Sequence, residues 1–168
     1  KSARKRIFEV ANALTGHQFA DDTMIVATSG RYEFKNKGID VFIHAMRKCL
    51  DQAAGLQNEV LALIQVPGWV AGPRADLQER LQNPQIYDTA LANPVITHNL
   101  HETEYDQVLN LFWALDIVNH PESKVKVIFV PCYLDGADGI FQMPYYDLLI
   151  GNDLAVYPSY YEPWGYTP

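Results

Sequence analysis

Several features are scarce in this 168-residue sequence, and each absence excludes a class of protein. Cysteine occurs twice, at Cys49 and Cys132, which lie far apart and outside any CxxC pair. We interpret both as buried free thiols of a cytoplasmic protein. Apolar runs are all too short to span a membrane, and no signal-type hydrophobic stretch follows the charged residues 1–6. A cytoplasmic location without membrane partners is therefore expected.

Basic residues are also in short supply, with 13 Lys and Arg against 20 Asp and Glu and a net charge of −7. Because phosphate backbones and anionic membranes require a positive face, the balance argues against nucleic acid as a partner. A phosphate-bearing ligand would need a local basic patch. The length and the apolar content of 48% suit one domain, residues 1–168, with a sizeable core.

Apolar spacing predicts helices that alternate with short buried strands. The predicted helices are residues 3–14, 39–54, 75–81, 105–118 and 145–150, and the predicted strands are 24–29, 60–66, 125–130 and 154–157. Gly151 is expected to end the last helix in a left-handed conformation. The alternation predicts an α/β fold, a Rossmann-like open parallel sheet with helices on both faces.

Ligands of open parallel sheets bind beyond the carboxyl ends of the strands. Two of the segments that leave strands there, residues 30–38 and 158–168, are the richest in chemical groups. They are the candidate site.

The segment 30–38 concentrates three cations in an acidic protein. Gly30 allows a sharp turn and a close ligand. Arg31 offers a planar fork of donors for phosphate oxygens, and Lys37 offers a point charge. Gly38 precedes a predicted helix, whose N-terminus favours anions. The alternative interpretation is a basic turn that only faces water.

The segment 158–168 combines aromatic residues, three prolines and one carboxylate, Glu162. Its Tyr and Trp side chains, Trp164 among them, would form a wall for a sugar, and Glu162 would bind hydroxyl groups or offset oxocarbenium charge. Thr167 and Pro168 resemble an N-cap and the first residue of a helix. The alternative is a structural aromatic loop in which Glu162 caps a turn.

These segments resemble one family, the glycogen synthases of the animal and fungal type, of which some bacteria carry relatives. The resemblance rests on GRYEF and NKG at 30–38, YYEPWGYTP at 160–168, THN at 97–99 and VKVIF at 125–129, in the family's order. It implies the GT-B architecture, with this chain as most of the C-terminal donor domain. The N-terminal domain and the end of this domain would lie outside the sequence.

The resemblance also implies an activity and a set of site residues. The activity is transfer of glucose from UDP-glucose or ADP-glucose to the 4-hydroxyl at the non-reducing end of an α-1,4-glucan, with retention and without metal or cofactor. Arg31 and Lys37 would hold the donor phosphates, and Glu162 would lie against the donor sugar as the first acid of a paired-glutamate motif. Further donor contacts would come from Gly30, Tyr145, Trp164, Gly165, Tyr166 and Thr167.

Tyr145 falls where the family places an aromatic residue that stacks on the base, with Tyr146 directly beside it. The second glutamate of the motif would come eight positions after Glu162, beyond the sequence. The fragment alone is expected to be inactive, and the full-length enzyme is expected to be a homo-oligomer.

Two other functions compete with this one. The first is a non-catalytic nucleotide- or carbohydrate-binding module, which would not need Glu162 beside two cations. The second is a phosphorylase-like enzyme, for which no pyridoxal-phosphate lysine motif is present. Metal binding through the HxxH at 98–101 or the DGAD at 135–138 lacks further ligands at characteristic spacing. His98 is instead expected to order a loop or line the cleft.

Overall fold

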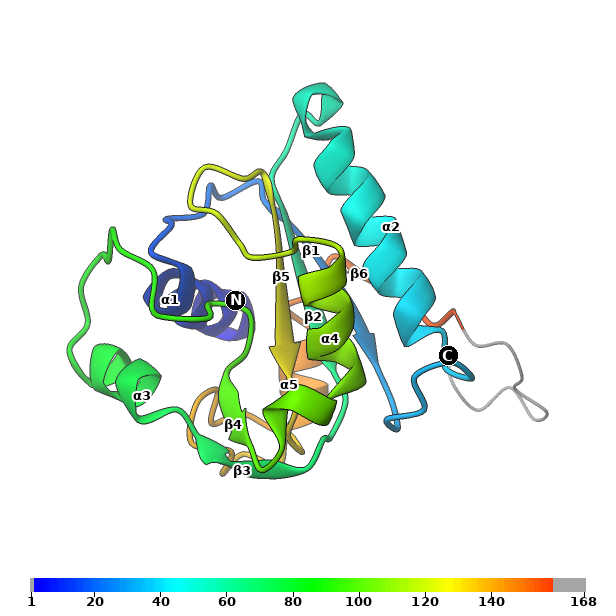
Figure 1. Cartoon of the computed structure of the whole chain (residues 1–168). Coiled ribbons are helices and arrows are strands. Elements are labelled where there is room, and N and C mark those ends of the chain that lie inside the picture. Colours follow the sequence, from blue (N-terminus) through cyan, green and yellow to red (C-terminus); the bar gives the residue numbers. More distant parts are fainter. Residues whose placement is uncertain (1, 159–168) are drawn as a thin grey trace.

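The computed structural model describes residues 2–158 of the chain, in which helices pack on both faces of a sheet (Figure 1). In chain order the elements are α1 (Ser2–Thr15), β1 (Met24–Ser29), α2 (Ile39–Asp51), η1 (Ala53–Gly55), β2 (Val60–Gln65), β3 (Val70–Pro73), α3 (Ala75–Gln82), β4 (His98–Leu100), η2 (Thr103–Tyr105), α4 (Gln107–Ala114), β5 (Val125–Val130), α5 (Tyr145–Leu149) and β6 (Leu154–Ala155). All four predicted strands and all five predicted helices are present, so the α/β fold is confirmed.

The main sheet has the strand order β5-β2-β1-β6, and every neighbouring pair is parallel. Strand β1 pairs with β2 along its whole length, from Met24 opposite Val60 to Ser29 opposite Gln65. Strand β6 is short, but the N–H of Val156 still donates to the carbonyl of Ala27 at 2.8 Å. The carboxyl ends of all four strands therefore meet at one edge of the sheet.

Each face of the sheet has its own hydrophobic cluster. Helices α2 and α4 pack on one face through Phe42, Ile43 and Phe112. Helices α1, α3 and α5 cover the other face through residues that include Ile7 and Leu14. Strands β2 and β5 are buried at every position, as expected of parallel strands covered on both sides.

The chain changes direction within the sheet between β1 and β6. From β1 it proceeds outward to β2 and then β5, and afterwards it returns to place β6 on the other side of β1. Such a reversal leaves a crevice beyond the carboxyl ends of the two strands that flank it, where ligands of open α/β sheets bind. The described residues that follow β1 and β6 are 30–38 and 156–158, so the loop after β1 and the start of the chain after β6 both lie at this crevice.

Several details differ from the predictions, among them strand β6, which ends at Ala155 and not at Tyr157. Helix α4 is shorter than residues 105–118, because Asp106 caps its start by accepting from the N–H of Leu109 at 2.9 Å and Asp116 (φ 55°) ends it in the left-handed conformation. Helix α2 ends at Asp51, and the turn η1 follows. The antiparallel pair β3 and β4 was not predicted, because Gly72 and Pro73 in so short a segment indicate a loop.

Gly151 does not adopt the predicted left-handed conformation. Helix α1 passes close beside it, so that a Cβ at this position would lie 2.9 Å from the backbone nitrogen of Arg4 and 3.0 Å from Cδ1 of Ile7. Glycine is required here by close packing of α1 against the end of α5.

Candidate functional site

A cavity of about 760 Å³ opens at the carboxyl edge of the main sheet. It is lined by Ser29 at the end of β1 and residues 30–32 after it, Gln65 at the end of β2 and Pro67 after it, residues 132–135 after β5, Tyr145, Tyr146 and Leu149 of α5, and Tyr157 after β6. Its size lies within the range of about 300–1,000 Å³ that small-ligand sites occupy. The place predicted from strand order therefore holds a cavity of suitable volume.

Gly30 and Arg31 form the cavity wall at the end of β1. Gly30 has φ 135°, which side chains disfavour, whereas an added Cβ would meet nothing within 4 Å. The turn therefore requires glycine for its conformation and not for space. The side chain of Arg31 is 80% exposed, and its Nε lies 2.9 Å from Oε2 of Glu33. Glu33 also accepts from Nδ2 of Asn36 at 2.9 Å, so one carboxylate joins both parts of the loop.

Tyr32 fastens this loop to α4. Its hydroxyl donates to Oδ2 of Asp106 at 2.9 Å and accepts from the N–H of Val108 at 3.0 Å, while its ring packs edge-on against Phe129 at 5.9 Å. Burial and the nearby Asp106 charge raise the pKa of Tyr32, and burial also raises the pKa of Asp106. Since Tyr32 directly follows Arg31, this anchor restricts where the guanidinium can reach.

A second set of contacts joins the ends of β1 and β6 through α5. The hydroxyl of Tyr145 lies 2.7 Å from Oγ of Ser29 and 3.4 Å from the hydroxyl of Tyr157. Burial raises the pKa of Tyr145, so its hydroxyl stays protonated at neutral pH. The ring of Tyr146 meets that of Tyr145 edge-on at 5.4 Å and is largely exposed. Both rings line the cavity, as an aromatic site for a base requires.

The start of α2 lies directly against the chain that leaves β6. Gly38 adopts φ 65°, and a Cβ there would come within 1.7 Å of the carbonyl oxygen of Pro158. The loop 30–38 and the segment that leads to Glu162 are thus in contact at Pro158, the last described residue.

The N-terminus of α2 is not an open anion site in this structure, contrary to the expectation for Gly38. The N–H groups of Ile39 and Asp40 both donate to the carbonyl of Phe34, and that of Val41 donates to Oδ1 of Asp40. The carboxylate of Asp40 also pairs with Lys35 at 2.8 Å. The first donors of the helix are therefore already used within the chain.

His98 orders the loop after β5, as predicted. Its Nε2 lies 2.9 Å from the carbonyl oxygen of Asp138 and its Nδ1 lies 2.7 Å from Oγ1 of Thr97, while burial lowers its pKa. Ligand atoms of His98, Cys132 and Asp138 lie within 4.8 Å of one another. The Asp138 carboxylate, however, accepts three backbone N–H groups, from residues 140–142, so it holds its own loop together.

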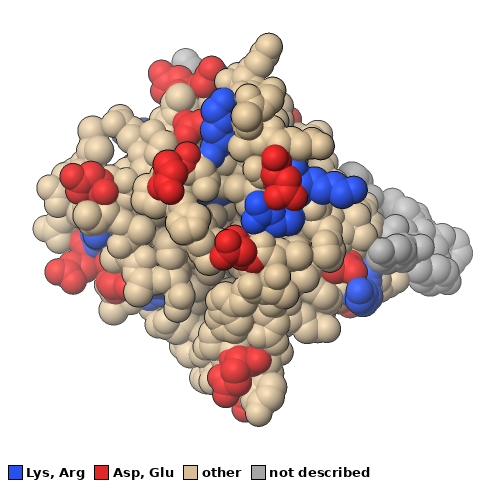
Figure 2. Space-filling model, turned by 45° about the horizontal axis from the view of Figure 1, so that its top comes forward, with Lys and Arg blue, Asp and Glu red and all other residues tan. Residues whose placement is uncertain are grey.

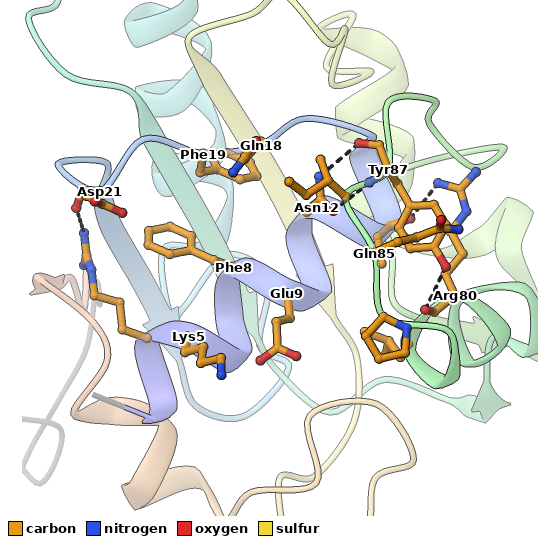
Figure 3. Close-up of a pocket in the computed structure, with 15 residues that line it drawn as sticks. Lys5, Phe8, Glu9, Asn12, Gln18, Phe19, Asp21, Arg80, Gln85 and Tyr87 are labelled. Carbon is orange, nitrogen blue, oxygen red and sulfur yellow. Dashed lines mark hydrogen bonds between the residues drawn. The ribbon is translucent and has the colours of Figure 1, made fainter.

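A further cavity of about 570 Å³ lies between α1 and residues 80–87, near the chain that enters the amino end of β1 (Figure 3). Phe8 stacks on Phe19 at 5.8 Å, and the Arg80 guanidinium covers the Tyr87 ring at 4.5 Å. This cavity lies away from the carboxyl edge of the main sheet.

The distribution of charged side chains on the surface fits the net charge of −7. On the face that Figure 2 shows, acidic and basic side chains are interspersed without an extended basic area. None of the helices among residues 2–158 has the length and apolar character needed to cross a membrane.

Comparison with known proteins identifies the family. The family model described as glycogen synthase matches residues 84–168, which is half of the chain. The chain belongs to the glycogen synthase family.

Individual relatives agree with the family model. The chain is 27% identical over 200 residues to glycogen [starch] synthase of Neurospora crassa, with 88% of this chain and 28% of that protein covered. It is 28% identical over 206 residues to isoform 2 of Saccharomyces cerevisiae, covering 88% of this chain and 29% of the relative. For the human liver protein the identity is 27% over 196 residues, covering 88% and 28%. The chain thus spans less than a third of the length of these curated relatives.

In this glycogen synthase family member, three of the predicted site residues, Gly30, Arg31 and Tyr145, line the cavity at the carboxyl edge of the sheet. Lys37, at the far end of the same loop, is half-buried and lies outside the cavity lining. The other predicted site residues, Glu162, Trp164, Gly165, Tyr166 and Thr167, lie outside the described residues, and their roles stay predictions.

Sequence reasoning missed two residues that hold the site together, Tyr32 and Ser29. Tyr32 was read only as part of the GRYEF string, and its partner Asp106 lies 74 positions further on. No local pattern indicates a contact over such a separation. For Ser29, its place at the end of a buried strand was an available signal.

Proposed function

We propose that this chain is the donor-nucleotide half of a retaining glucosyltransferase. It would bind UDP-glucose or ADP-glucose and take part in transfer of glucose to the 4-hydroxyl at the non-reducing end of an α-1,4-glucan. One observation carries the proposal: in a chain of the glycogen synthase family, the loop with Arg31 and the segment leading to Glu162 leave adjacent parallel strands at the switch point of the sheet. A cavity of about 760 Å³ opens there.

The ion pair between Arg31 and Glu33 is weaker than a contact of Arg31 with phosphate, so a bound diphosphate would displace it. An exposed ion pair contributes only about 0–1 kcal/mol, and Arg31 is 80% exposed. A charge-assisted contact with phosphate contributes about 1.5–3 kcal/mol. The pair also uses Nε, whereas the terminal nitrogens of a guanidinium form forked contacts with phosphate oxygens. Glu33 therefore positions Arg31 before the donor arrives.

The proposed chemistry proceeds on one face of the donor sugar. The bond between C1 and the phosphate oxygen breaks, the acceptor 4-hydroxyl oxygen bonds to C1, and its proton passes to the departing phosphate. Arg31 and Lys37 would stabilise the charge that grows on the diphosphate, and Glu162 would lie against the sugar. Loss of one preorganised donor to such charge costs about 10²–10³ in rate. We propose that no metal or cofactor is needed for this step.

The remaining parts of the proposal concern the whole protein. Because the chain spans less than a third of the relatives' length, we propose that 168 residues alone bind nucleotide weakly and do not turn over. We further propose that the complete enzyme works as a homo-oligomer in the cytoplasm.

The test uses the complete encoded protein with UDP-glucose and ADP-glucose in turn and glycogen as acceptor. Arg31→Ala, Lys37→Ala and Glu162→Ala are each expected to lower kcat/KM by about 10²-fold or more. Lys5→Ala, which removes an exposed cation of α1, is the matched control and should leave the rate unchanged. Near-wild-type transfer by the Arg31 or Glu162 variant would show that the assigned roles are wrong.

A further inference from the structure

A second, smaller cavity of about 280 Å³ lies beside the candidate donor site. Its lining includes Trp69, Tyr105, Glu102 and Gln107, and it shares Tyr32 with the larger cavity. The side chain of Tyr32 thus forms a wall between the two. Strands β3 and β4, which border this region, lie at the bottom of Figure 1, at the edge toward which β5 points.

Two large aromatic side chains are exposed here. Trp69 is 66% exposed and Tyr105 is 73% exposed. The ring of His101 lies 4.9 Å from that of Trp69 and supports it at an angle of 46°. Single exposed apolar residues need no explanation, but exposed rings grouped around a cavity indicate a binding surface.

The backbone holds Trp69 firmly in this position. The N–H of His101 donates to the carbonyl of Trp69 at 3.0 Å, and the N–H of Gly68 donates to the carbonyl of Pro131 at 2.9 Å. The first bond fastens Trp69 to the end of β4, and the second ties its neighbour to the end of β5. A ring fixed in this way can stack on a ligand with little further loss of conformational entropy.

The polar groups around the cavity disfavour an anionic ligand. Glu102, Asp106 and Gln107 line it, and Lys and Arg are missing from the part of the lining that the structure describes. The oxygens of Asp106 already accept from Tyr32 and Leu109. A phosphate would be repelled here, whereas sugar hydroxyl groups can donate to Glu102 and exchange hydrogen bonds with Gln107.

The volume suits one part of a long ligand. At about 280 Å³ the cavity is slightly smaller than sites that enclose a whole small molecule, which start at about 300 Å³. A polysaccharide whose end reaches the donor sugar must cross the rim of the donor cavity. Tyr32 forms the part of that rim that lies between the donor cavity and the smaller cavity. Stacked pyranose rings present apolar C–H faces to aromatic side chains.

We infer that Trp69 and Tyr105 form an acceptor subsite that holds glucosyl units of an α-glucan while its end reaches the donor sugar. The inference rests on the proposed transferase function. It adds two positioning residues for the glucan on the neighbouring surface, which no pattern in the sequence assigns.

The test measures transfer by the complete encoded protein with maltoheptaose as acceptor. Trp69→Ala and Tyr105→Ala are each expected to raise the KM for maltoheptaose about fivefold to tenfold, with a larger effect in the double variant. The KM for the nucleotide sugar and kcat at saturating acceptor should stay within about twofold of wild type, because the diphosphate contacts are untouched. Trp69→Phe should restore most of the affinity.

Trp113→Ala is the matched control, because Trp113 is 46% exposed on α4 and lies outside the cavity lining. It should leave every constant unchanged. An unchanged KM for maltoheptaose in the double variant, or an equal rise in the KM of the nucleotide sugar, would overturn the inference.

Direct titration with maltoheptaose separates this inference from the proposed function. Tryptophan fluorescence of the complete protein should change on binding, and Trp69→Ala should abolish most of the change. If the wild type binds maltoheptaose through Trp69 but transfers no glucose from either donor, the proposed function is wrong, and Trp69 belongs to a glucan-binding site that is not an acceptor subsite. If it transfers glucose while Trp69→Ala binds maltoheptaose normally, the subsite is wrong and the function stands.

Discussion

Replacing Tyr32 by Phe tests whether the Arg31 loop is anchored through α4. The substitution removes one hydroxyl that donates to the Asp106 carboxylate at 2.9 Å and accepts from the N–H of Val108 at 3.0 Å. A hydrogen bond to a charged group contributes about 1.5–3 kcal/mol, and the variant also leaves the N–H of the buried Val108 without this partner. We expect the free energy of unfolding at pH 7 to fall by about 2–3 kcal/mol.

The effect should depend on pH in a defined direction. Burial raises the pKa of Asp106 above its ordinary value, so the folded protein binds a proton at a higher pH than the unfolded chain does. The Asp106 term therefore lowers stability as pH rises from the ordinary pKa through the raised one. The Tyr32 hydroxyl offsets that loss because it stabilises the charged carboxylate. The difference between wild type and Tyr32→Phe should be largest at pH 7 and shrink toward pH 4.

Urea denaturation of the 168-residue chain measures this free energy, because both faces of its sheet have their own core. Tyr133→Phe is the control, since that side chain is 77% exposed, and it should change stability by less than about 0.5 kcal/mol. In the complete protein, Tyr32→Phe should also raise the KM of the nucleotide sugar, because Arg31 loses its fixed position. A variant as stable as wild type at pH 7, or equally destabilised at pH 4, would refute the reasoning.

Three other perturbations test separate parts of the account. Gly38→Ala should lower the free energy of unfolding in urea by more than about 1 kcal/mol, because φ is 65° and the new Cβ would meet Pro158. Unchanged stability would contradict the contact between the loop 30–38 and Pro158. Burial lowers the pKa of Lys126 to about 8, so above pH 8 the folded protein releases a proton that the unfolded chain keeps. The free energy of unfolding of wild type should therefore rise, relative to that of Lys126→Met, by up to about 1.4 kcal/mol per pH unit between pH 8 and 10. A constant difference across that range would show that Lys126 is not desolvated. Burial raises the pKa of Cys132 to about 12, so at pH 8 iodoacetamide should modify Cys49 much faster than Cys132 in the native protein, and equal rates would contradict the described packing.

The main sheet could be predicted from sequence because its strands are short apolar runs buried on both faces. The predicted strands 24–29 and 125–130 match the structure, since the first has polar residues only at its last two positions, Thr28 and Ser29, and Lys126 alone interrupts the second. Lys126 is tolerated because its Nζ donates to the carbonyls of Pro121 and Ser123, just before the start of the strand. The pair β3 and β4 was missed because its partners are separated by more than twenty residues and its register is irregular.

The candidate site could be predicted only in part. The positions of Gly30 and Arg31 follow from strand order, and their cavity was found where expected. The state of the helix α2 terminus could not be foreseen, because the carbonyl of Phe34 folds back onto it through a loop without a regular pattern. The exposed rings of Trp69 and Tyr105 come together only through tertiary contacts of β3 and β4, so no spacing along the sequence reveals them.

The most direct test of the account is a crystal structure of the complete encoded protein with UDP-glucose or its non-hydrolysable analogue. The account predicts the diphosphate in the crevice beyond β1 and β6, with nitrogens of Arg31 and Lys37 about 3 Å from its oxygens and Glu162 against the hexose. A diphosphate bound elsewhere, or Arg31 and Glu162 on opposite edges of the sheet, would contradict it.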